Sequence, residues 1–222
     1  NPENFEQEVL PVNEFTVEAF EELRNHNSEE SALGQLRELG TDLGSMDISQ
    51  FPNEIQNACF ICCNSYQKPQ YKLGVGPIND SITVAANHKY MGYNVYFLHN
   101  PKSDQFLEFL QLFLEKTTDY LTVYYTGHGA NVKDTSGDED DGLDEVMVFD
   151  DSYIVDDILA EAIQEYANGK TKIVLINDCC HSGTIWDIPL DEEEAKDFPA
   201  NVICLSAADD NETAKQGKQG NN

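Results

Sequence analysis

Two reactive side chains follow two short apolar segments of this sequence. Cys180 comes shortly after the run 173–176, and His128 comes shortly after the run 120–125. Both runs are rich in β-branched or aromatic residues and have the length of a strand. In a parallel sheet the carboxyl ends of the strands meet at one edge, which is where α/β proteins place their reactive groups. We therefore expect the thiol and the imidazole to lie close together.

A thiol beside an imidazole can perform nucleophilic catalysis. The thiolate is the nucleophile, and a neighbouring histidine can take the thiol proton and later return it to a leaving amine. Gly129 leaves room for its backbone N–H to face a substrate oxygen, and with the N–H of Cys180 it would form an oxyanion hole. The pattern leaves open whether Cys179 or Cys180 acts, because neighbours on a strand point to opposite faces. His181 is a poorer base than His128, because it directly follows the thiol.

The composition is that of one strongly acidic globular domain. The 222 residues include 41 acidic and 13 basic ones, which gives a formal net charge of −28. This charge argues against nucleic acid or an anionic membrane as a partner and favours metal ions or basic peptides. The apolar runs are also far too short to cross a membrane. Six cysteines, four of them in two adjacent pairs, make a poor disulfide framework. We therefore expect reduced thiols and a cytoplasmic location.

Strands alternate with helices from about residue 58 onward. We expect strands at 58–63, 93–98, 120–125, 173–176 and 202–206, and helices at 78–91, 103–116 and 155–166. The helix at 103–116 carries apolar residues at the spacing of one buried face, namely Phe106, Phe109, Leu110 and Phe113. This alternation predicts an α/β fold in which a mostly parallel sheet has helices on both faces.

The first 50 residues contain no convincing strand. Two short acidic helices and a linker are predicted there, at 17–24, 29–39 and 40–52. We expect residues 1–50 to form an acidic N-terminal helical arm or pro-segment and residues 51–222 to form the catalytic domain. One hypothesis lays this arm across the active-site cleft, with Arg24 or Arg37 offered as a pseudo-substrate.

Four motifs occur in order along the second half of the chain. They read YYTGHG at 124–129, GDEDDGLDE at 137–145, IVDD at 154–157 and DCCHSG at 178–183. Together they resemble the motifs of the metacaspases, a group of caspase-fold cysteine peptidases. The resemblance covers residues 58–210 and implies a caspase-like fold for residues 51–222. It also implies that only the start of a small-subunit region is present, with a further C-terminal portion outside this chain.

The resemblance assigns roles to particular residues. It implies that Cys180, directly before His-Ser-Gly, is the nucleophile and that His128 is its base. It implies cleavage after Arg or Lys, with Asp80, Thr126 and Asp178 binding the substrate. The role of Asp178 makes physical sense, because a carboxylate pairs bidentately with a guanidinium. Basic peptides or proteins are then the expected substrates of a monomeric zymogen that cleaves itself.

The resemblance further implies activation by calcium. Four aspartates match the family's calcium site, namely Asp144, Asp156, Asp157 and Asp187. Carboxylate oxygens are the ligands that calcium prefers. The residues alone also allow a plainer interpretation, since the stretch 134–157 holds 11 carboxylates and no Lys or Arg. Such a run is usually a solvated loop.

Two other functions stay open on the sequence. One is a legumain-type peptidase that cuts after Asn, and the pair Asp80 and Asp178 argues against it. The other is a catalytically silent caspase-like scaffold that binds calcium or a partner. The presence of both His128 and Cys180 argues against this second alternative.

Overall fold

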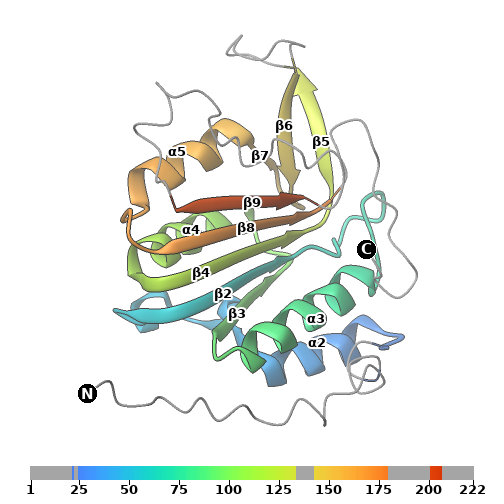
Figure 1. The fold of residues 1–222 in the computed structure, drawn as a ribbon. Coiled ribbons are helices and arrows are strands. Elements are labelled where there is room, and N and C mark those ends of the chain that lie inside the picture. Colours follow the sequence, from blue (N-terminus) through green and yellow to red (C-terminus); the bar gives the residue numbers. More distant parts are fainter. Residues whose placement is uncertain (1–21, 23–24, 134–142, 180–200, 207–222) are drawn as a thin grey trace.

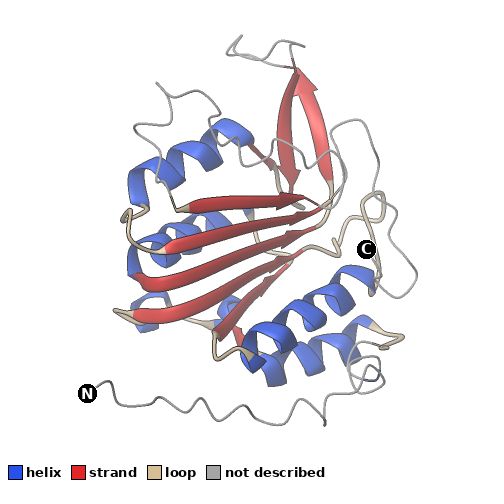
Figure 2. Cartoon of the chain, viewed as in Figure 1, coloured by secondary structure: helices blue, strands red, loops and turns tan. Residues whose placement is uncertain are grey.

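The computed structural model describes residues 22, 25–133, 143–179 and 201–206. Its centre is a six-stranded sheet in the order β1-β3-β2-β4-β8-β9, with every pair of neighbours parallel (Figures 1 and 2). The strands are Thr41–Asp42 (β1), Ile55–Cys63 (β2), Asn94–His99 (β3), Thr117–Thr126 (β4), Lys172–Asp178 (β8) and Val202–Ser206 (β9). The predicted parallel sheet is therefore confirmed.

Helices cover both faces of this sheet, as predicted (Figure 1). The helices on one face are α2 (Glu29–Leu39) and α3 (Gly76–Tyr90), and those on the other are α4 (Ser103–Lys116) and α5 (Asp156–Tyr166). The apolar face predicted for α4 is buried, and the ring of Phe113 stacks on Phe60 of β2 with centroids 4.6 Å apart. Contacts of this kind make aromatic residues a large part of the core energy.

A second, antiparallel sheet rises from the carboxyl end of β4 (Figure 1). It has three strands in the order β5-β6-β7, which are Gly129–Lys133, Leu143–Val148 and Tyr153–Val155. None of the strands predicted from the sequence falls in this region, where the residues alone allowed a solvated acidic loop. The difference arises because Val146, Met147 and Ile154 turn into the core, where each is at most 2% exposed. Three short strands with acidic residues between them give little periodicity to detect.

The segment before β2 is more structured than predicted. Residues 29–39 form α2 as expected, but the predicted linker contains the edge strand β1, which pairs with β3. It also buries Leu43 and Phe51 in the main core. Helix α3 begins at Gly76, two residues earlier than predicted, with a proline in its first turn. Residues 1–21 and Arg24 of the predicted arm lie outside the described residues.

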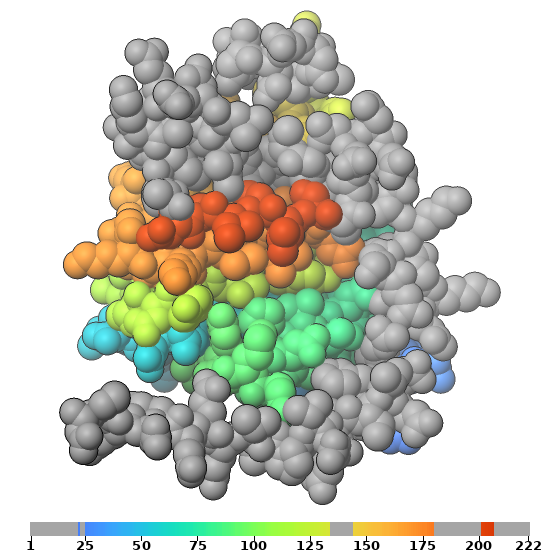
Figure 3. All heavy atoms as spheres, in the orientation of Figure 1, coloured from blue at the N-terminus to red at the C-terminus, as the bar shows by residue number. Residues whose placement is uncertain are grey.

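Strand β9 forms one edge of the parallel sheet and lies at the surface. Figure 3 shows this strand in red on the face toward the viewer. Its residues Ile203 and Leu205 are 59% and 51% exposed, although both are large and apolar. None of the helices in the described part of the chain has the length and hydrophobicity to cross a membrane.

Candidate active site

The carboxyl ends of three neighbouring strands place two of the predicted substrate-binding residues side by side. Cys63 on β2 is in register with Thr126 on β4, and Thr126 is in register with Asp178 on β8. Residues in register on parallel strands share one face of the sheet. All three are buried, and the side-chain oxygen of Thr126 has no hydrogen bond within the described residues. The resemblance had implied that Thr126 and Asp178 both bind the substrate, and the sheet brings them together.

The third predicted substrate-binding residue, Asp80, comes from α3 on the same face. The hydroxyl of Tyr124 donates a hydrogen bond of 2.8 Å to Asp178 Oδ2. Burial raises the pKa of Tyr124 well above its usual value, and the charges of Asp178 and Asp80 raise it further. Burial also raises the pKa of the Cys63 thiol to about 12. A hydrogen bond with Ser81 lowers this pKa, whereas the charge of Asp80 raises it. Asp178 and Asp80 therefore both act on the buried hydroxyl of Tyr124.

His128 lies just beyond β4, against the loop that follows β2. Its Nε2–H donates to the carbonyl oxygen of Tyr71 at 2.7 Å, and its ring stacks on Tyr66 with centroids 4.9 Å apart. A carbonyl oxygen can only accept a hydrogen bond, so this contact requires the proton on Nε2. In the neutral ring Nδ1 is then unprotonated, and it is the nitrogen able to accept a proton from a thiol.

The small sheet sets the direction of the Gly129 backbone. The N–H of Val148 donates to the carbonyl oxygen of His128 at 3.1 Å, which makes these two residues a hydrogen-bonded pair. Pairs alternate along an antiparallel ladder, so the next pair, Gly129 with Met147, points its N–H groups away from the partner strand. The Gly129 N–H is thus turned outward, as the predicted oxyanion hole requires.

The two adjacent cysteines are not equivalent. Cys179 is 2% exposed and belongs to the core cluster on the side of α4 and α5. A thiol packed in the core cannot meet a substrate, which favours its neighbour Cys180 as the nucleophile. Cys180 itself lies outside the described residues, as do His181 and Asp187.

Two of the predicted calcium ligands, Asp144 and Asp156, lie near one end of the β6–β7 hairpin. Its pairing ends at Val146 and Val155, so Asp144 precedes and Asp156 follows that end closely. Both carboxylates are buried, at 6% and 2% exposure. Across the described ranges, no group of three or more His, Cys, Asp or Glu side chains is placed to hold a metal ion. The oxygen donors suit calcium chemically, but these residues do not by themselves complete a site.

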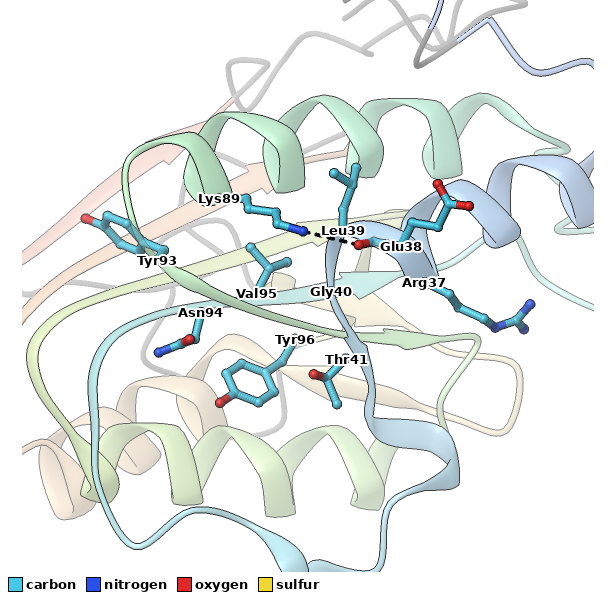
Figure 4. Close-up of a pocket in the computed structure, with 10 residues that line it drawn as sticks. All are labelled: Arg37, Glu38, Leu39, Gly40, Thr41, Lys89, Tyr93, Asn94, Val95 and Tyr96. Atoms are coloured by element: carbon cyan, nitrogen blue, oxygen red, sulfur yellow. Dashed lines mark hydrogen bonds between the residues drawn. The ribbon is translucent and has the colours of Figure 1, made fainter. Parts of the chain in front are cut away.

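A pocket of about 360 Å³ lies elsewhere, at the amino end of β3 (Figure 4). The ends of α2 and α3 form its other walls. Its two cations are already engaged, since Lys89 Nζ donates to the Glu38 carbonyl oxygen at 3.3 Å and Arg37 pairs with Asp42 at 3.5 Å. The pocket offers no nucleophile with a base, so we assign it no role in the chemistry.

Three tyrosines of the site were not anticipated from the sequence, namely Tyr66, Tyr71 and Tyr124. Strand alternation could have identified Tyr124, since it lies two residues before Thr126 and therefore shares its face. Tyr66 and Tyr71 belong to the irregular loop after β2, where no periodicity links a residue to a direction. Their contacts with His128 depend on the course of that loop.

Gly127 is expected to be the least replaceable glycine near this site. Its φ of +155° is rarely adopted by other residues, and a Cβ there would lie 2.6 Å from the Tyr66 hydroxyl and 3.0 Å from the Tyr125 hydroxyl. We expect Gly127→Ala to lower the free energy of unfolding by about 3 kcal/mol or more, because backbone strain adds to a clash with buried groups. Thermal unfolding followed by circular dichroism measures the effect.

Gly92→Ala is the matched control for this prediction. Gly92 also has a positive φ of +89°, but a Cβ there would meet nothing within 4 Å. Gly92→Ala should therefore lower the free energy of unfolding by about 1 kcal/mol, through backbone strain alone. Equal losses in the two variants would show that the contacts around Gly127 do not matter.

Comparisons with known proteins agree with this arrangement. Metacaspase-1A of Neurospora crassa is 33% identical over 132 residues, which are 51% of this chain and 29% of that protein. Among solved structures, protein GSU0716 from Geobacter sulfurreducens aligns with a TM-score of 0.59 at 20% identity, covering 73% of this chain and 76% of that one. Caspase-1 from Spodoptera frugiperda aligns with a TM-score of 0.53 at 12% identity, covering 77% and 66%. At these identities the two structures support the fold alone.

The family assignment rests on a match to a larger part of the chain. The chain spans less than a third of the length of the curated relatives it matches. The family model of the metacaspase, peptidase C14 domain matches residues 62–189, which include β3, β4, β8 and the motifs around His128 and Cys180. This is more than half of the chain, and the chain therefore belongs to the metacaspase family.

Proposed function

We propose that this chain is the catalytic part of a cysteine endopeptidase that cuts peptide bonds after Arg or Lys. The observation that carries this proposal is the acidic site formed by Asp178 and Asp80 beside the strand end that leads to His128. A buried carboxylate pair is suited to an arginine or lysine side chain and unsuited to an acidic or amide side chain. The hydroxyl oxygen of Thr126, which has no hydrogen bond among the described residues, would supply a further polar contact in the same site.

The proposed reaction uses Cys180 as nucleophile and His128 as base. Nδ1 of His128 takes the thiol proton, and the thiolate attacks the carbonyl carbon of the basic residue. The backbone N–H groups of Gly129 and Cys180 bind the oxyanion as it forms. The imidazolium then gives its proton to the leaving amine, which leaves a thioester on Cys180. Water, activated by His128, hydrolyses the thioester and regenerates the thiol.

We further propose that calcium activates this peptidase. Asp144, Asp156 and Asp157 would hold the ion together with Asp187, and the burial of Asp144 and Asp156 close to one hairpin end supports their role. Bound calcium would neutralise this group of carboxylates and order the segments that carry them. Since β6 of that hairpin pairs with the strand that follows His128, ordering the hairpin would steady the base.

The remaining features of the proposal concern the setting of the enzyme. A reducing, cytoplasmic location is favoured because none of the five described cysteines is in a disulfide. Basic peptides or proteins are the proposed substrates of a monomeric zymogen. A C-terminal small-subunit portion would cover the exposed Ile203 and Leu205 on β9.

Hydrolysis of fluorogenic peptides with calcium and then with a chelator tests these proposals. We expect cleavage of Arg- and Lys-ended peptides with calcium and loss of activity to background with the chelator. Adding calcium back should restore it, whereas magnesium should not, because magnesium is smaller and demands a stricter geometry. Cleavage of an Asn-ended peptide instead would favour the legumain-type alternative. No cleavage in any condition, with no labelling by a thiol probe, would favour the silent scaffold.

A further inference from the structure

We propose that Tyr66 is a positioning residue for His128, and that its hydroxyl group fixes the backbone of the catalytic base. This inference rests on the proposed function, because it assigns a role in the same site. It concerns a side chain that would not itself touch the substrate.

The Tyr66 hydroxyl takes the place of one bond in the ladder of the small sheet. In a regular hydrogen-bonded pair, His128 and Val148 would exchange two N–H to C=O bonds. One of these is present, from the Val148 N–H to the His128 carbonyl oxygen at 3.1 Å. The other is relayed: the His128 N–H donates to the Tyr66 hydroxyl at 2.6 Å, and that hydroxyl donates to the Val148 carbonyl oxygen at 2.9 Å.

The hydroxyl of a second tyrosine, Tyr125, also forms hydrogen bonds with His128 and Val148. Tyr125 donates to the carbonyl oxygen of His128 at 2.7 Å or of Val148 at 3.0 Å, and it accepts from the Val148 N–H at 3.2 Å. Burial raises the pKa of both tyrosines, so both hydroxyls keep their protons to donate. The peptide groups on both sides of the His128 Cα are therefore fixed by buried tyrosine hydroxyls.

The loop holds Tyr66 in an uncommon backbone conformation. Its φ is +63°, in the left-handed region that few residues other than glycine occupy. The Oδ1 atom of Asn100 accepts from the backbone N–H groups of Ser65 and Tyr66, both at 2.9 Å. The carboxylate of Asp150 accepts from the next two N–H groups, those of Gln67 and Lys68. A strained residue persists where its surroundings fix it, and strain of this kind clusters at functional sites.

The Tyr66 ring also limits the rotation of the imidazole. The two rings stack at 24° with centroids 4.9 Å apart, and the bond from Nε2–H to Tyr71 holds the far side of the imidazole. Backbone and ring are thus fixed together, which keeps Nδ1 directed to one place. An error of about 1 Å in the position of a catalytic group can cost on the order of 100-fold in rate.

The test is Tyr66→Phe, which removes the hydroxyl and keeps the ring. We expect kcat for an Arg-ended peptide to fall roughly 10- to 100-fold with KM nearly unchanged, because the misplaced base acts in the transition state. NMR of ¹⁵N-labelled histidine rings gives a second readout that does not need activity. His128 should be the Nε2–H tautomer in the wild type, and the Nδ1–H tautomer should become populated in the variant.

Tyr153→Phe is the matched control, since Tyr153 lies on β7 and is 52% exposed. It should leave kcat and the His128 tautomer unchanged. Tyr66→Phe would overturn the inference if it lowered the melting temperature but left both kcat and the tautomer as in the wild type. If the wild type itself cut no peptide, the proposed function would fail, and the tautomer comparison would still decide the role of Tyr66.

Discussion

Replacing His128 by alanine is expected to lower kcat/KM for an Arg-ended peptide by roughly 10²- to 10⁴-fold. This is the usual contribution of a general acid and base, which here both activates the thiol and protonates the leaving amine. The fold should survive, because His128 is only half-buried and its ring packs against the side chains of Tyr66 and Tyr71 in one loop. Steady-state kinetics at saturating calcium measures the effect, and circular dichroism checks the fold.

The other histidine near the nucleophile provides the control. His181→Ala should retain most of the activity, because a residue directly after the thiol is badly placed to act as its base. Cys180→Ala should abolish turnover, since the described cysteines at the strand ends, Cys63 and Cys179, are both buried. The assignment of the base is wrong if His181→Ala loses as much activity as His128→Ala does.

Asp178→Asn is expected to lower kcat/KM for an Arg-ended peptide by about 30- to 1,000-fold. Removing one partner of a desolvated ion pair costs about 2–4 kcal/mol, which corresponds to that range. The change keeps the size of the side chain, and its Oδ1 atom can still accept the hydrogen bond that Tyr124 now donates to the carboxylate. A loss of specificity is therefore expected without a loss of structure. The measurement compares peptides that end in arginine with peptides that end in citrulline, the neutral isostere.

Asp119→Asn separates this effect from a change in overall charge. Asp119 lies on the neighbouring strand β4, near its amino end, and accepts a hydrogen bond from Gln56 at the surface. Asp119→Asn should change kcat/KM for the Arg-ended peptide less than twofold. If Asp178→Asn lowered kcat/KM equally for the arginine and the citrulline peptides, Asp178 would be a structural carboxylate. The specificity for arginine would then have another source.

The regular parts of this fold could be predicted from the sequence because their patterns repeat. The face of α4 that carries Phe106, Phe109, Leu110 and Phe113 follows one helical period, and all four residues are buried. The apolar run that became β8 extends further than predicted, from Lys172 to Asp178. Its last residues are polar, and their strand geometry comes from pairing with β4, which is a tertiary effect.

The site was only partly predictable. Thr126 and Asp178 could be placed together because strand ends in a parallel sheet meet at one edge. The contacts of Tyr66 could not be predicted. They depend on its left-handed backbone conformation, in a loop that is fixed by Asn100 and Asp150 from distant parts of the chain. Side-chain and backbone bonds of this long-range kind leave no local signature in the sequence.

The order of strands in the parallel sheet also bears on how the molecule reaches its native state. Strand β4, which precedes the base, pairs with β2 across residues 64–116, whereas β8, which leads to the nucleophile, pairs with β4 across a separate long connection, residues 127–171. Closing such a long loop costs entropy before any contact repays it, so pairings of this kind form slowly. A partly folded chain can therefore have its histidine in position while its acidic site still lacks Asp178. Substrate recognition and proton transfer become available together, at the step in which β8 docks.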